Sequence, residues 1–341
     1  QRQMCIRDRI IHDNVKKEIF FVKNIFSDIK INNLEKKYFE IQDEINSLLI
    51  GSKVSKFQKD NSNKKFSVKS NISKKRFFQI VHKAKQYIKK GDIFQVVLSQ
   101  RFETKLTKKP IEIYKKLRVT NPSPFMFFFN FNDFQIIGAS PEILVRLRNN
   151  VITVRPIAGT RPRGRNNKED NLLKKDLIND KKELSEHLML LDLGRNDAGK
   201  VSKINTVKVT ERFKIEKYSH VMHIVSNVTG VYDKKFSKFE ALMAGFPAGT
   251  VSGAPKIRAM EIIDELEKNS RKIYAGGIGY FSANGDFDTC IALRTAVTKN
   301  NKFYVQAGAG IVADSKPINE YNETINKAKA LIKSLEKWKY F

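Results

Sequence analysis

Apolar residues recur at helical spacing in several separate stretches of the chain. Between Ser73 and about Lys90 they fall on one face of a helix, at Phe77, Ile80, Val81, Ala84 and Ile88. Ser73 is a favourable first cap for this helix, and Gly91 and Asp92 follow as a stop signal. The same reasoning predicts further helices over 34–50, 172–193, 257–268 and 319–335.

Segments with strand character lie between these helices, over 93–102, 125–148 and 302–307. The segment 272–297 predicts a β-hairpin, because the strong turn signal Asn284-Gly285 separates two apolar runs. Strands cluster with strands and helices with helices, instead of alternating along the chain. The pattern therefore favours an α+β fold over a parallel βαβ arrangement.

The first part of the chain has a different character. Residues 1–72 are rich in Lys and Asn with weak apolar periodicity, and 51–71 have the polarity of a linker. Residues 1–9 resemble no other part of the chain and are a candidate artefact of cloning or assembly. We expect one large folded domain over 73–341, after a truncated or degenerate N-terminal region and linker over 1–72.

Composition narrows the class of protein. A chain of 341 residues with 41% hydrophobic content is long enough and apolar enough to bury a sizeable core. It has no run of about 18 apolar residues and no signal-peptide core, so we expect a cytoplasmic protein without a membrane span. Its two cysteines, Cys5 and Cys290, are too far apart to indicate a disulfide framework or a zinc site.

The net charge of +28 raises the alternative of a nucleic-acid-binding protein. The excess is mostly lysine, spread along the whole chain without a regular alternation of basic and aromatic residues. Basic charge alone indicates non-specific association. We therefore expect no nucleic-acid partner; a steep salt dependence of DNA or RNA binding would support the alternative.

Two pairs of carboxylates are candidates for a metal site. Glu183 and Glu186 share one face of a predicted helix, and Glu320 and Glu323 have the same spacing on the last one. Four carboxylates from two helices form an oxygen donor set of the kind that Mg²⁺ prefers. On spacing alone, two solvated charged faces are the simpler explanation.

Tyr274 and Arg294 are candidates for binding an anion. In the second strand of the predicted hairpin, Arg294 shares a face with Asp288, Cys290, Ala292 and Ala296. The small neighbours make a plausible cavity floor, and a guanidinium suits bidentate recognition of a carboxylate. An exposed strand arginine is the open alternative.

Two glycine-containing segments are also candidates. Gly308-Ala309-Gly310 lacks the helix that a dinucleotide-binding motif must open, so it indicates either backbone N–H groups near an anion or a glycine-rich turn. The segment 246–256 leads into a helix whose N-terminus is a potential anion site. Standing alone, it is more simply a loop with an ordinary cap.

The combination and order of these segments resemble the chorismate-utilising enzymes. The resemblance covers about residue 74 to the C-terminus. It is carried by PIAGTRPRG (156–164), SEHLMLLDLGRND (185–197), FPAGTVSGAPK (246–256), YAGGIGYF (274–281), DTCIALRTA (288–296), QAGAG (306–310) and ETINK (323–327). It implies an α+β fold of two large antiparallel sheets packed together, with helices outside and the active site in the central cleft.

The resemblance also implies a role for each matching residue. Glu186 and Glu323 would hold Mg²⁺, supported by Glu183 and Glu320. Binding of chorismate would involve Tyr274, Arg294, Gly308, Ala309, Gly310, Thr250 and Lys327. The catalytic residues would be Glu142 as general acid, His223 in the pyruvate-releasing half, Gln95 and Thr250.

Two positions indicate which reaction of the family to expect. Relatives that add water to chorismate carry a lysine where Gln95 stands, and glutamine cannot serve as a base. Aminodeoxychorismate synthases commonly carry a lysine where Ala158 stands. The resemblance is therefore to anthranilate synthase large subunits, which aminate chorismate at C2, lose the C4 hydroxyl and eliminate pyruvate; aminodeoxychorismate synthase is the alternative.

One element of the family's feedback site is missing from this sequence. The resemblance also implies a partner subunit that supplies ammonia. The Leu-Leu-Glu-Ser element of the family's tryptophan feedback site is not found, although Pro124, Phe125, Met126 and Cys290 match the other half of that site. A Cys-His-Glu glutaminase triad is not found either. Ammonia would come from solution or from a glutamine amidotransferase subunit, in a heterotetramer.

Overall fold

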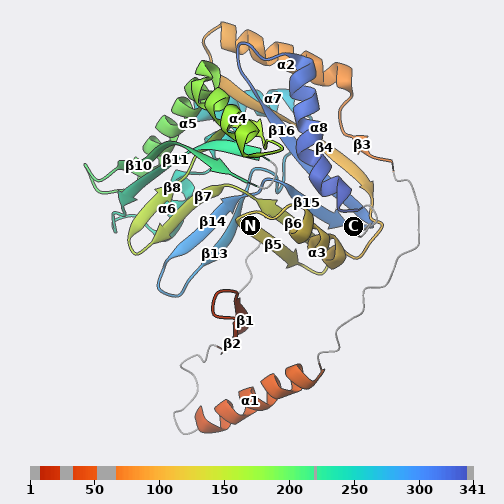
Figure 1. Cartoon of the computed structure of the whole chain (residues 1–341), viewed down its shortest axis with the longest axis vertical. Coiled ribbons are helices and arrows are strands. Elements are labelled where there is room, and N and C mark those ends of the chain that lie inside the picture. The colour runs from red at the N-terminus through yellow and green to blue at the C-terminus, as the bar shows by residue number, and fades with distance from the viewer. Residues whose placement is uncertain (1–7, 24–33, 52–66, 219–220, 336–341) are drawn as a thin grey trace. The chain divides into compact units, whose positions relative to one another are not determined.

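The computed structural model describes residues 8–23, 34–51, 67–218 and 221–335, in two compact units, 1–62 and 63–341. The first unit contains a hairpin of β1 (Asp8–Asp13) and β2 (Glu18–Lys23), and helix α1 (Leu34–Gly51) where the pattern predicts one (Figure 1). Cys5 and most of the expected linker lie outside the described residues. The second unit begins before Ser73, because β3 (Lys69–Ser70) pairs with β4.

Two seven-stranded sheets form the second unit, and every pairing in them is antiparallel. Sheet I has the order β12-β4-β16-β15-β6-β5, with β3 beside β4; sheet II has the order β10-β11-β8-β7-β14-β13, with β9 beside β11. The strands of sheet I are β4 (Gln95–Lys105), β5 (Phe125–Asn130), β6 (Phe134–Ser140), β12 (Gly253–Ala254), β15 (Thr295–Lys299) and β16 (Lys302–Ile311). Those of sheet II are β7 (Ile143–Arg148), β8 (Val151–Val154), β9 (Ile157–Pro162), β10 (Lys208–Lys217), β11 (Val221–Val231), β13 (Gly277–Phe281) and β14 (Phe287–Ile291). The expected α+β fold is confirmed.

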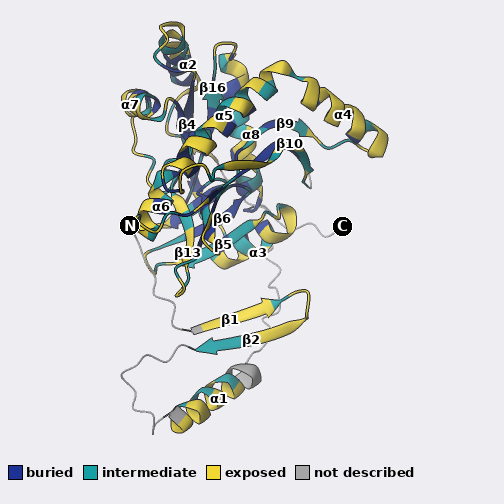
Figure 2. Cartoon of the chain, turned by 90° about the vertical axis from the view of Figure 1, so that its left-hand side faces the viewer, coloured by how far each residue is buried: buried dark blue, intermediate teal, exposed yellow. Residues whose placement is uncertain are grey.

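Helices cover both sheets (Figures 1 and 2). Contacts with sheet I are made by α2 (Lys74–Lys89), α3 (Pro110–Thr120), α7 (Lys256–Leu266) and α8 (Pro317–Lys333). Contacts with sheet II are made by α4 (Asn167–Asn179), α5 (Lys181–Gly199) and α6 (Lys238–Ala244). Helix α2 begins as predicted, with the Ser73 hydroxyl accepting from the Arg76 N–H at 3.2 Å, and its apolar face is buried.

At two places the chain passes from one sheet directly to the other without an intervening helix, along neighbouring paths. Strand β6 continues into β7 through Pro141 and Glu142, and β14 continues into β15 through the segment that ends at Arg294. The two crossings are hydrogen-bonded: Ala139 N donates to Arg294 O at 3.2 Å, and Ile291 N donates to Glu142 O at 3.0 Å. Since β14 ends at Ile291 and Arg294 has a φ of +46°, the predicted single strand through Arg294 is wrong.

Two other expectations from the sequence are corrected. The helix expected over 172–193 is two helices, because Asp180 ends α4 and caps α5, its carboxylate accepting from the N–H groups of Lys182 and Glu183 at 3.0 and 3.2 Å. The glycine-rich turn considered for 308–310 is wrong, since β16 continues through it to Ile311. Gly308 and Gly310 therefore belong to the interior of sheet I.

Replacing the residue at the break between α4 and α5 tests its role as a cap. Asp180→Ala leaves two N–H groups at the start of α5 without an acceptor, so we expect the free energy of unfolding to fall by about 1–2 kcal/mol. Asp180→Asn keeps an equally good cap and should lose clearly less. Urea unfolding of both variants measures the difference, and equal losses would contradict the capping role.

Candidate active site

The residues expected to form the site come from both sheets and from two helices. Gln95 and Gly308 lie on strands of sheet I, His223 on β11 of sheet II, and Glu142 and Arg294 on the two crossings between the sheets. The carboxylates lie on α5 and α8, and Thr250 lies in a short 3₁₀ turn (Gly249–Val251). Strand β12 lies between this turn and α7, so Thr250 is not at the N-terminus of α7.

Carboxylates of α5 and α8 influence one another. Burial raises the pKa of Glu186, the charge of Glu183 raises it further, and Glu323 of α8 adds to the effect. Burial also raises the pKa of Glu320. The two helices thus bring negative charge together, although their carboxylates are more than a hundred residues apart in sequence.

Each of the three more exposed carboxylates has a polar partner. Gln95 Nε2 donates to Glu186 Oε1 at 2.9 Å, Arg161 Nη1 to Glu183 Oε1 at 3.2 Å, and Lys327 Nζ to Glu323 Oε1 at 2.6 Å. Within the described part of the chain, no three His, Cys, Asp or Glu side chains are gathered as metal ligands. The donor set nevertheless fits a hard divalent cation, because carboxylate oxygens are its preferred ligands and their mutual repulsion would be relieved.

An open strand edge lies next to these carboxylates. Strand β16 has β15 on one side only as far as Val305, whereas it pairs with β4 on the other side as far as Ile311. The side of β16 away from β4 is therefore unpaired after Val305. Lys327 Nζ donates to Gly308 O at 3.1 Å, so the Gly308 backbone faces away from β4. A Cβ at Gly308 would lie 2.7 Å from the Tyr274 hydroxyl, and one at Gly310 would lie 2.4 Å from Gln95 Nε2. The glycines therefore let Tyr274 and Gln95 approach the strand.

Two polar groups at the site lack a protein partner among the described residues, and a third, the Thr250 hydroxyl, has only the Glu142 carboxyl near it. The Arg294 guanidinium is half-buried and has no ion pair or hydrogen bond. Gln95 Oε1 and Thr250 Oγ1 are buried without a hydrogen bond of ordinary geometry. Buried polar groups are normally paired, so this set indicates a place where a polar ligand binds.

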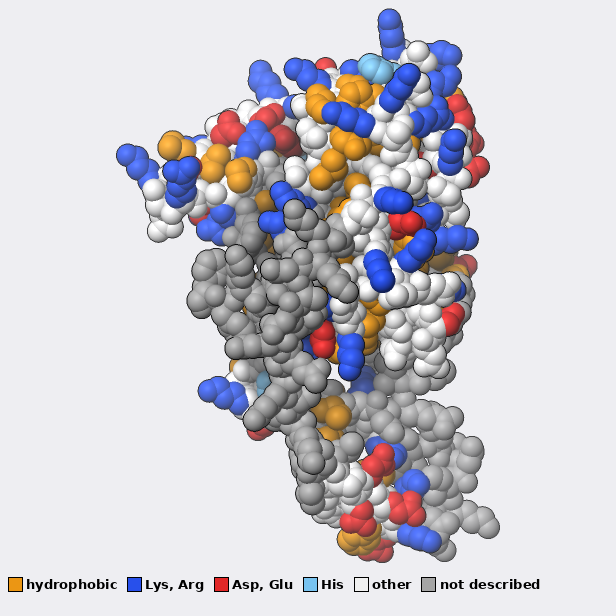
Figure 3. Space-filling model, turned by 90° about the vertical axis from the view of Figure 1, so that its right-hand side faces the viewer, with side chains coloured by type: hydrophobic (Ala, Val, Ile, Leu, Met, Phe, Trp, Pro, Cys, Tyr) orange, Lys and Arg blue, Asp and Glu red, His pale blue; other side chains and the backbone are white. Residues whose placement is uncertain are grey.

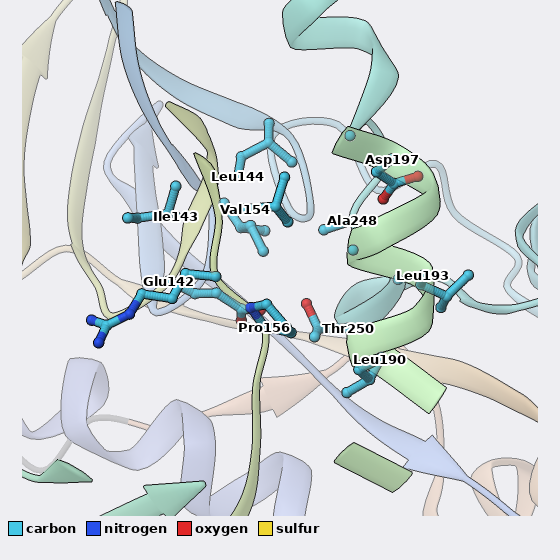
Figure 4. Close-up of a pocket in the computed structure, with 15 residues that line it drawn as sticks. Glu142, Ile143, Leu144, Val154, Pro156, Leu190, Leu193, Asp197, Ala248 and Thr250 are labelled. Atoms are coloured by element: carbon cyan, nitrogen blue, oxygen red, sulfur yellow. The ribbon is translucent and has the colours of Figure 1, made fainter. Parts of the chain in front are cut away.

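Glu142 is a buried carboxyl close to Arg294. Burial raises its pKa to about 8, and the Thr250 hydroxyl and the positive charges of Lys327 and Arg294 only partly offset that rise. Glu142 and Thr250 both line a small cavity of about 30 Å³ between sheet II and α5 (Figure 4). At neutral pH this carboxyl is therefore mainly protonated and able to donate a proton.

His223 is buried, and burial lowers its pKa to about 4, so its imidazole is neutral at pH 7. Its Nδ1 lies 3.2 Å from Gly159 O and 3.0 Å from Thr160 Oγ1. Because a carbonyl oxygen can only accept, we assign the hydrogen to Nδ1. Nε2 then keeps its lone pair and can accept a proton.

Some residues at the site carried no individual signal in the sequence. Arg161 lies in the PIAGTRPRG motif, but only the structure shows that it binds Glu183 together with Asp176 and Asp180. Tyr218 follows β10 as an ordinary aromatic residue, yet its ring lies 5.5 Å from that of His223. His187, next to Glu186 in the sequence, is buried with Nε2 2.7 Å from Ser226 Oγ.

The four residues matched to the feedback site are not all together. Cys290 is buried in a core cluster against which Phe125 packs, whereas Met126 packs against a different cluster. Pro124 and Phe125 also line a cavity of about 680 Å³ beside sheet II. Burial raises the pKa of the Cys290 thiol to about 12, so it is an unreactive part of the core.

The surface bears on the remaining alternatives. On the face shown in Figure 3, Lys and Arg side chains are dispersed among apolar and neutral ones, without a continuous basic stripe. Among the residues that the structure describes, no helix has the length and apolar character needed to cross a membrane.

Comparison with known proteins identifies one family. The profile of the chorismate binding enzymes matches residues 2–333. Anthranilate synthase component 1 of Cereibacter sphaeroides is 61% identical over 269 residues, which are 79% of this chain and 54% of that protein. The same component of Acetivibrio thermocellus is 51% identical over 335 residues, covering 96% of this chain and 67% of that protein. The chain thus spans about half to two thirds of the length of these relatives.

Solved structures agree with this family. Anthranilate synthase component I from Streptococcus pneumoniae superimposes with a TM-score of 0.85 at 44% identity, covering 95% of this chain and 72% of that one. A putative 2,3-dihydroxybenzoate-specific isochorismate synthase from Bacillus anthracis has a TM-score of 0.71 at 26% identity, covering 81% and 76%.

The raised pKa of Glu142 makes stability depend on pH in a defined direction. Between pH 6.5 and 8 the folded carboxyl keeps a proton that the unfolded chain has lost, so the free energy of unfolding falls as pH rises, by up to roughly 1.4 kcal/mol per pH unit. The buried histidines, whose pKa values are lowered from 6.5, have their effect below this window. Urea unfolding should show this slope in the wild type and a smaller one in Glu142→Gln; parallel curves would contradict the assignment.

Proposed function

Because this chain belongs to the chorismate binding enzyme family, we propose that it is the catalytic part of an anthranilate synthase large subunit. It would aminate chorismate at C2 with loss of the C4 hydroxyl and then eliminate pyruvate. The observation that carries the proposal is a buried carboxyl, Glu142, with the Thr250 hydroxyl and the Arg294 guanidinium near it, together with the unpaired Oε1 of Gln95 near Glu186. Both relatives described above are anthranilate synthase component 1, which supports the choice of reaction.

Chorismate carries two carboxylates, and the site offers two kinds of partner for them. The free guanidinium of Arg294 suits the enolpyruvyl carboxylate, together with the Tyr274 hydroxyl. The open edge at Gly308 and Gly310 supplies backbone N–H donors to the same group, and Ala309 between them holds the strand on β4. Thr250 and Lys327 lie on the same side and complete this half of the pocket.

The ring carboxylate would be bound through magnesium. Glu186 and Glu323 would hold the ion, and Glu183 and Glu320 would support it; the like-charge repulsion at Glu186 fits this role. When bound, Mg²⁺ neutralises the substrate carboxylate and fixes the ring. Lys327 pairs with Glu323 at 2.6 Å, so it would have to release this carboxylate for the ion.

Two residues would move protons. Glu142, with its pKa near 8, donates a proton to the departing C4 hydroxyl, which is otherwise a poor leaving group. His223 Nε2, free because Nδ1 bonds to Gly159 O, accepts the C2 proton as pyruvate leaves. Loss of that proton produces an aromatic ring, so the second half of the reaction is strongly downhill.

The nucleophile would be ammonia. Gln95 has no useful proton affinity, but its unpaired Oε1 can accept a hydrogen bond and orient an amine. Ala158 has no amine, so a covalent lysine–substrate intermediate at that position is excluded. A glutamine amidotransferase subunit, in a cytoplasmic heterotetramer, would supply the ammonia; the alternative reaction is that of aminodeoxychorismate synthase.

One incubation tests the proposal. The chain is mixed with chorismate, Mg²⁺ and ammonium at alkaline pH, and anthranilate fluorescence and pyruvate are followed. Both products should appear together. Aminodeoxychorismate without pyruvate would reject the proposal in favour of the alternative, and unchanged chorismate would reject both.

Substitution of the metal-binding carboxylates should weaken metal binding directly. We expect Glu183→Gln to lose roughly 10–100-fold in affinity for Mn²⁺, used as a magnetic probe for Mg²⁺, and Glu186→Gln or Glu323→Gln to lose more. Electron paramagnetic resonance measures the free ion without any need for turnover. Glu261→Gln, on the exposed face of α7, is the control. Unchanged Mn²⁺ affinity in Glu186→Gln would reject the metal site.

Removal of the free guanidinium should mainly affect substrate binding. Arg294→Ala leaves a substrate carboxylate without its charged partner, which costs roughly 2–5 kcal/mol and appears as a raised KM for chorismate. Arg148→Ala removes an arginine of sheet II that pairs with Asp288 and is half-exposed, so its KM should stay near the wild-type value. An unchanged KM in Arg294→Ala would remove this residue from the site.

A lysine in place of Gln95 should change the nucleophile. A buried amine with a lowered pKa can take a proton from water, so some isochorismate should form and amination should decrease. Gln95→Met removes the amide without adding a base, and it should decrease amination without yielding isochorismate. Chromatography separates the products. Isochorismate from both variants, or from neither, would contradict the assigned role.

A further inference from the structure

A second guanidinium, that of Arg271, contacts Tyr274 and the turn that contains Thr250. Its side chain is only 15% exposed. It donates to Glu267 through Nε at 3.0 Å and through Nη2 at 2.6 Å. It also donates to two backbone carbonyls, Val251 O and Val97 O, each at 2.6 Å. Four of its five N–H groups are therefore used, on three separate segments.

Glu267 extends this network into sheet I. Its side chain is 7% exposed, and Oε1 accepts from Ser99 N at 2.7 Å and from Ser99 Oγ at 2.9 Å. Ser99 Oγ in turn lies 2.7 Å from Gln306 Nε2 on β16. The charged pair thus connects the end of α7 with the two central strands β4 and β16.

This network fixes two residues of the proposed substrate pocket, Thr250 and Tyr274. Val251 directly follows Thr250, so the bond to Val251 O fixes the turn that presents the Thr250 hydroxyl. The Arg271 guanidinium also lies 5.5 Å from the centre of the Tyr274 ring, and Tyr274 N donates to Arg271 O at 3.2 Å. Tyr274 in turn reaches the Gly308 edge of β16.

We propose that Arg271, held by Glu267, is a positioning residue. It fixes the Tyr274 hydroxyl and the Thr250 hydroxyl relative to Gly308 and Gly310 of β16. This inference rests on the proposed function for the identity of the ligand, but the network itself does not. Lysine cannot replace Arg271, because one ammonium cannot reach a carboxylate and two carbonyls on three segments in a planar fork. Arg271 acts through Tyr274 and Thr250 and does not touch the substrate.

A double-mutant cycle separates positioning from general stability. Arg271→Lys should raise the KM for chorismate roughly ten- to a hundredfold, with a smaller change in kcat and an unchanged half-saturating Mg²⁺ concentration. In the Tyr274→Phe background the same substitution should have a clearly smaller effect, because the hydroxyl it positions is already gone. Equal factors in both backgrounds would overturn the proposal.

Two further variants keep the test decisive. Arg258→Lys changes an arginine near the start of α7 that binds Asp92 and Glu261 at the surface, and it should leave the KM unchanged. Glu267→Gln keeps the volume and removes the charge, so it should reproduce the KM effect of Arg271→Lys if that variant does not fold. A wild-type KM in folded Glu267→Gln would overturn the proposal.

Hydrogen exchange provides a readout that does not depend on chorismate. In Arg271→Lys the amides of 249–253 and 272–276 should exchange faster than in the wild type, whereas those of α5 should not. If the wild type makes no anthranilate, the proposed function fails while this exchange pattern still tests the network. Unchanged exchange in both segments would overturn the positioning role even in an active enzyme.

Discussion

The geometry of the site depends on two chain crossings that run side by side between the sheets. Strands β6 and β15 pair in sheet I, their continuations β7 and β14 pair in sheet II, and the links between them are joined by the bonds Ala139 N to Arg294 O and Ile291 N to Glu142 O. The Glu142 carboxyl and the Arg294 guanidinium are therefore fixed to neighbouring links between the two sheets. The positive φ of Arg294 is part of this arrangement, because the chain must turn there to leave one sheet for the other.

Burial alters the charge states of the ionisable groups at the site. Glu142 and Arg294 are close enough to influence each other, yet burial raises the pKa of Glu142 to about 8, and Arg294 forms no ion pair with any residue that the structure describes. Carboxylates of α5 and α8 repel one another at Glu186. A guanidinium without an ion pair suits an anionic group of a ligand, and crowded carboxylates suit a divalent cation.

Rigid supports lie beneath these groups. Asp180 both caps α5 and binds Arg161, which in turn binds Glu183, so the start of that helix and one of its carboxylates are fixed together. Arg271, held by Glu267, likewise fixes the turn that contains Thr250 and contacts the ring of Tyr274. Each support uses a guanidinium fork, because this group can bind several segments at once in a fixed geometry.

The sequence by itself determined the elements with strong local signals and the chemistry of the motifs. Ser73 capped α2, the apolar face of that helix was buried, and the turn at Asn284-Gly285 joined β13 to β14 as predicted, because caps and tight turns depend on neighbouring residues. The resemblance of the motifs indicated the family that the comparisons later identified. It also named Glu142, Arg294 and the paired glutamates before any distance was known.

Only the tertiary structure decided where strands end and which groups meet. The alternation of residues predicted that Arg294 continues β14. The strand ends at Ile291 instead, because the chain leaves sheet II there and enters sheet I at Thr295. Likewise, Gly308 and Gly310 are strand residues because β4 pairs along their whole length, which no local pattern reveals. The free state of Arg294, the protonation of Glu142 and the links made by Arg161 and Arg271 arise from burial and from contacts between distant segments, and such contacts leave no periodicity in the sequence.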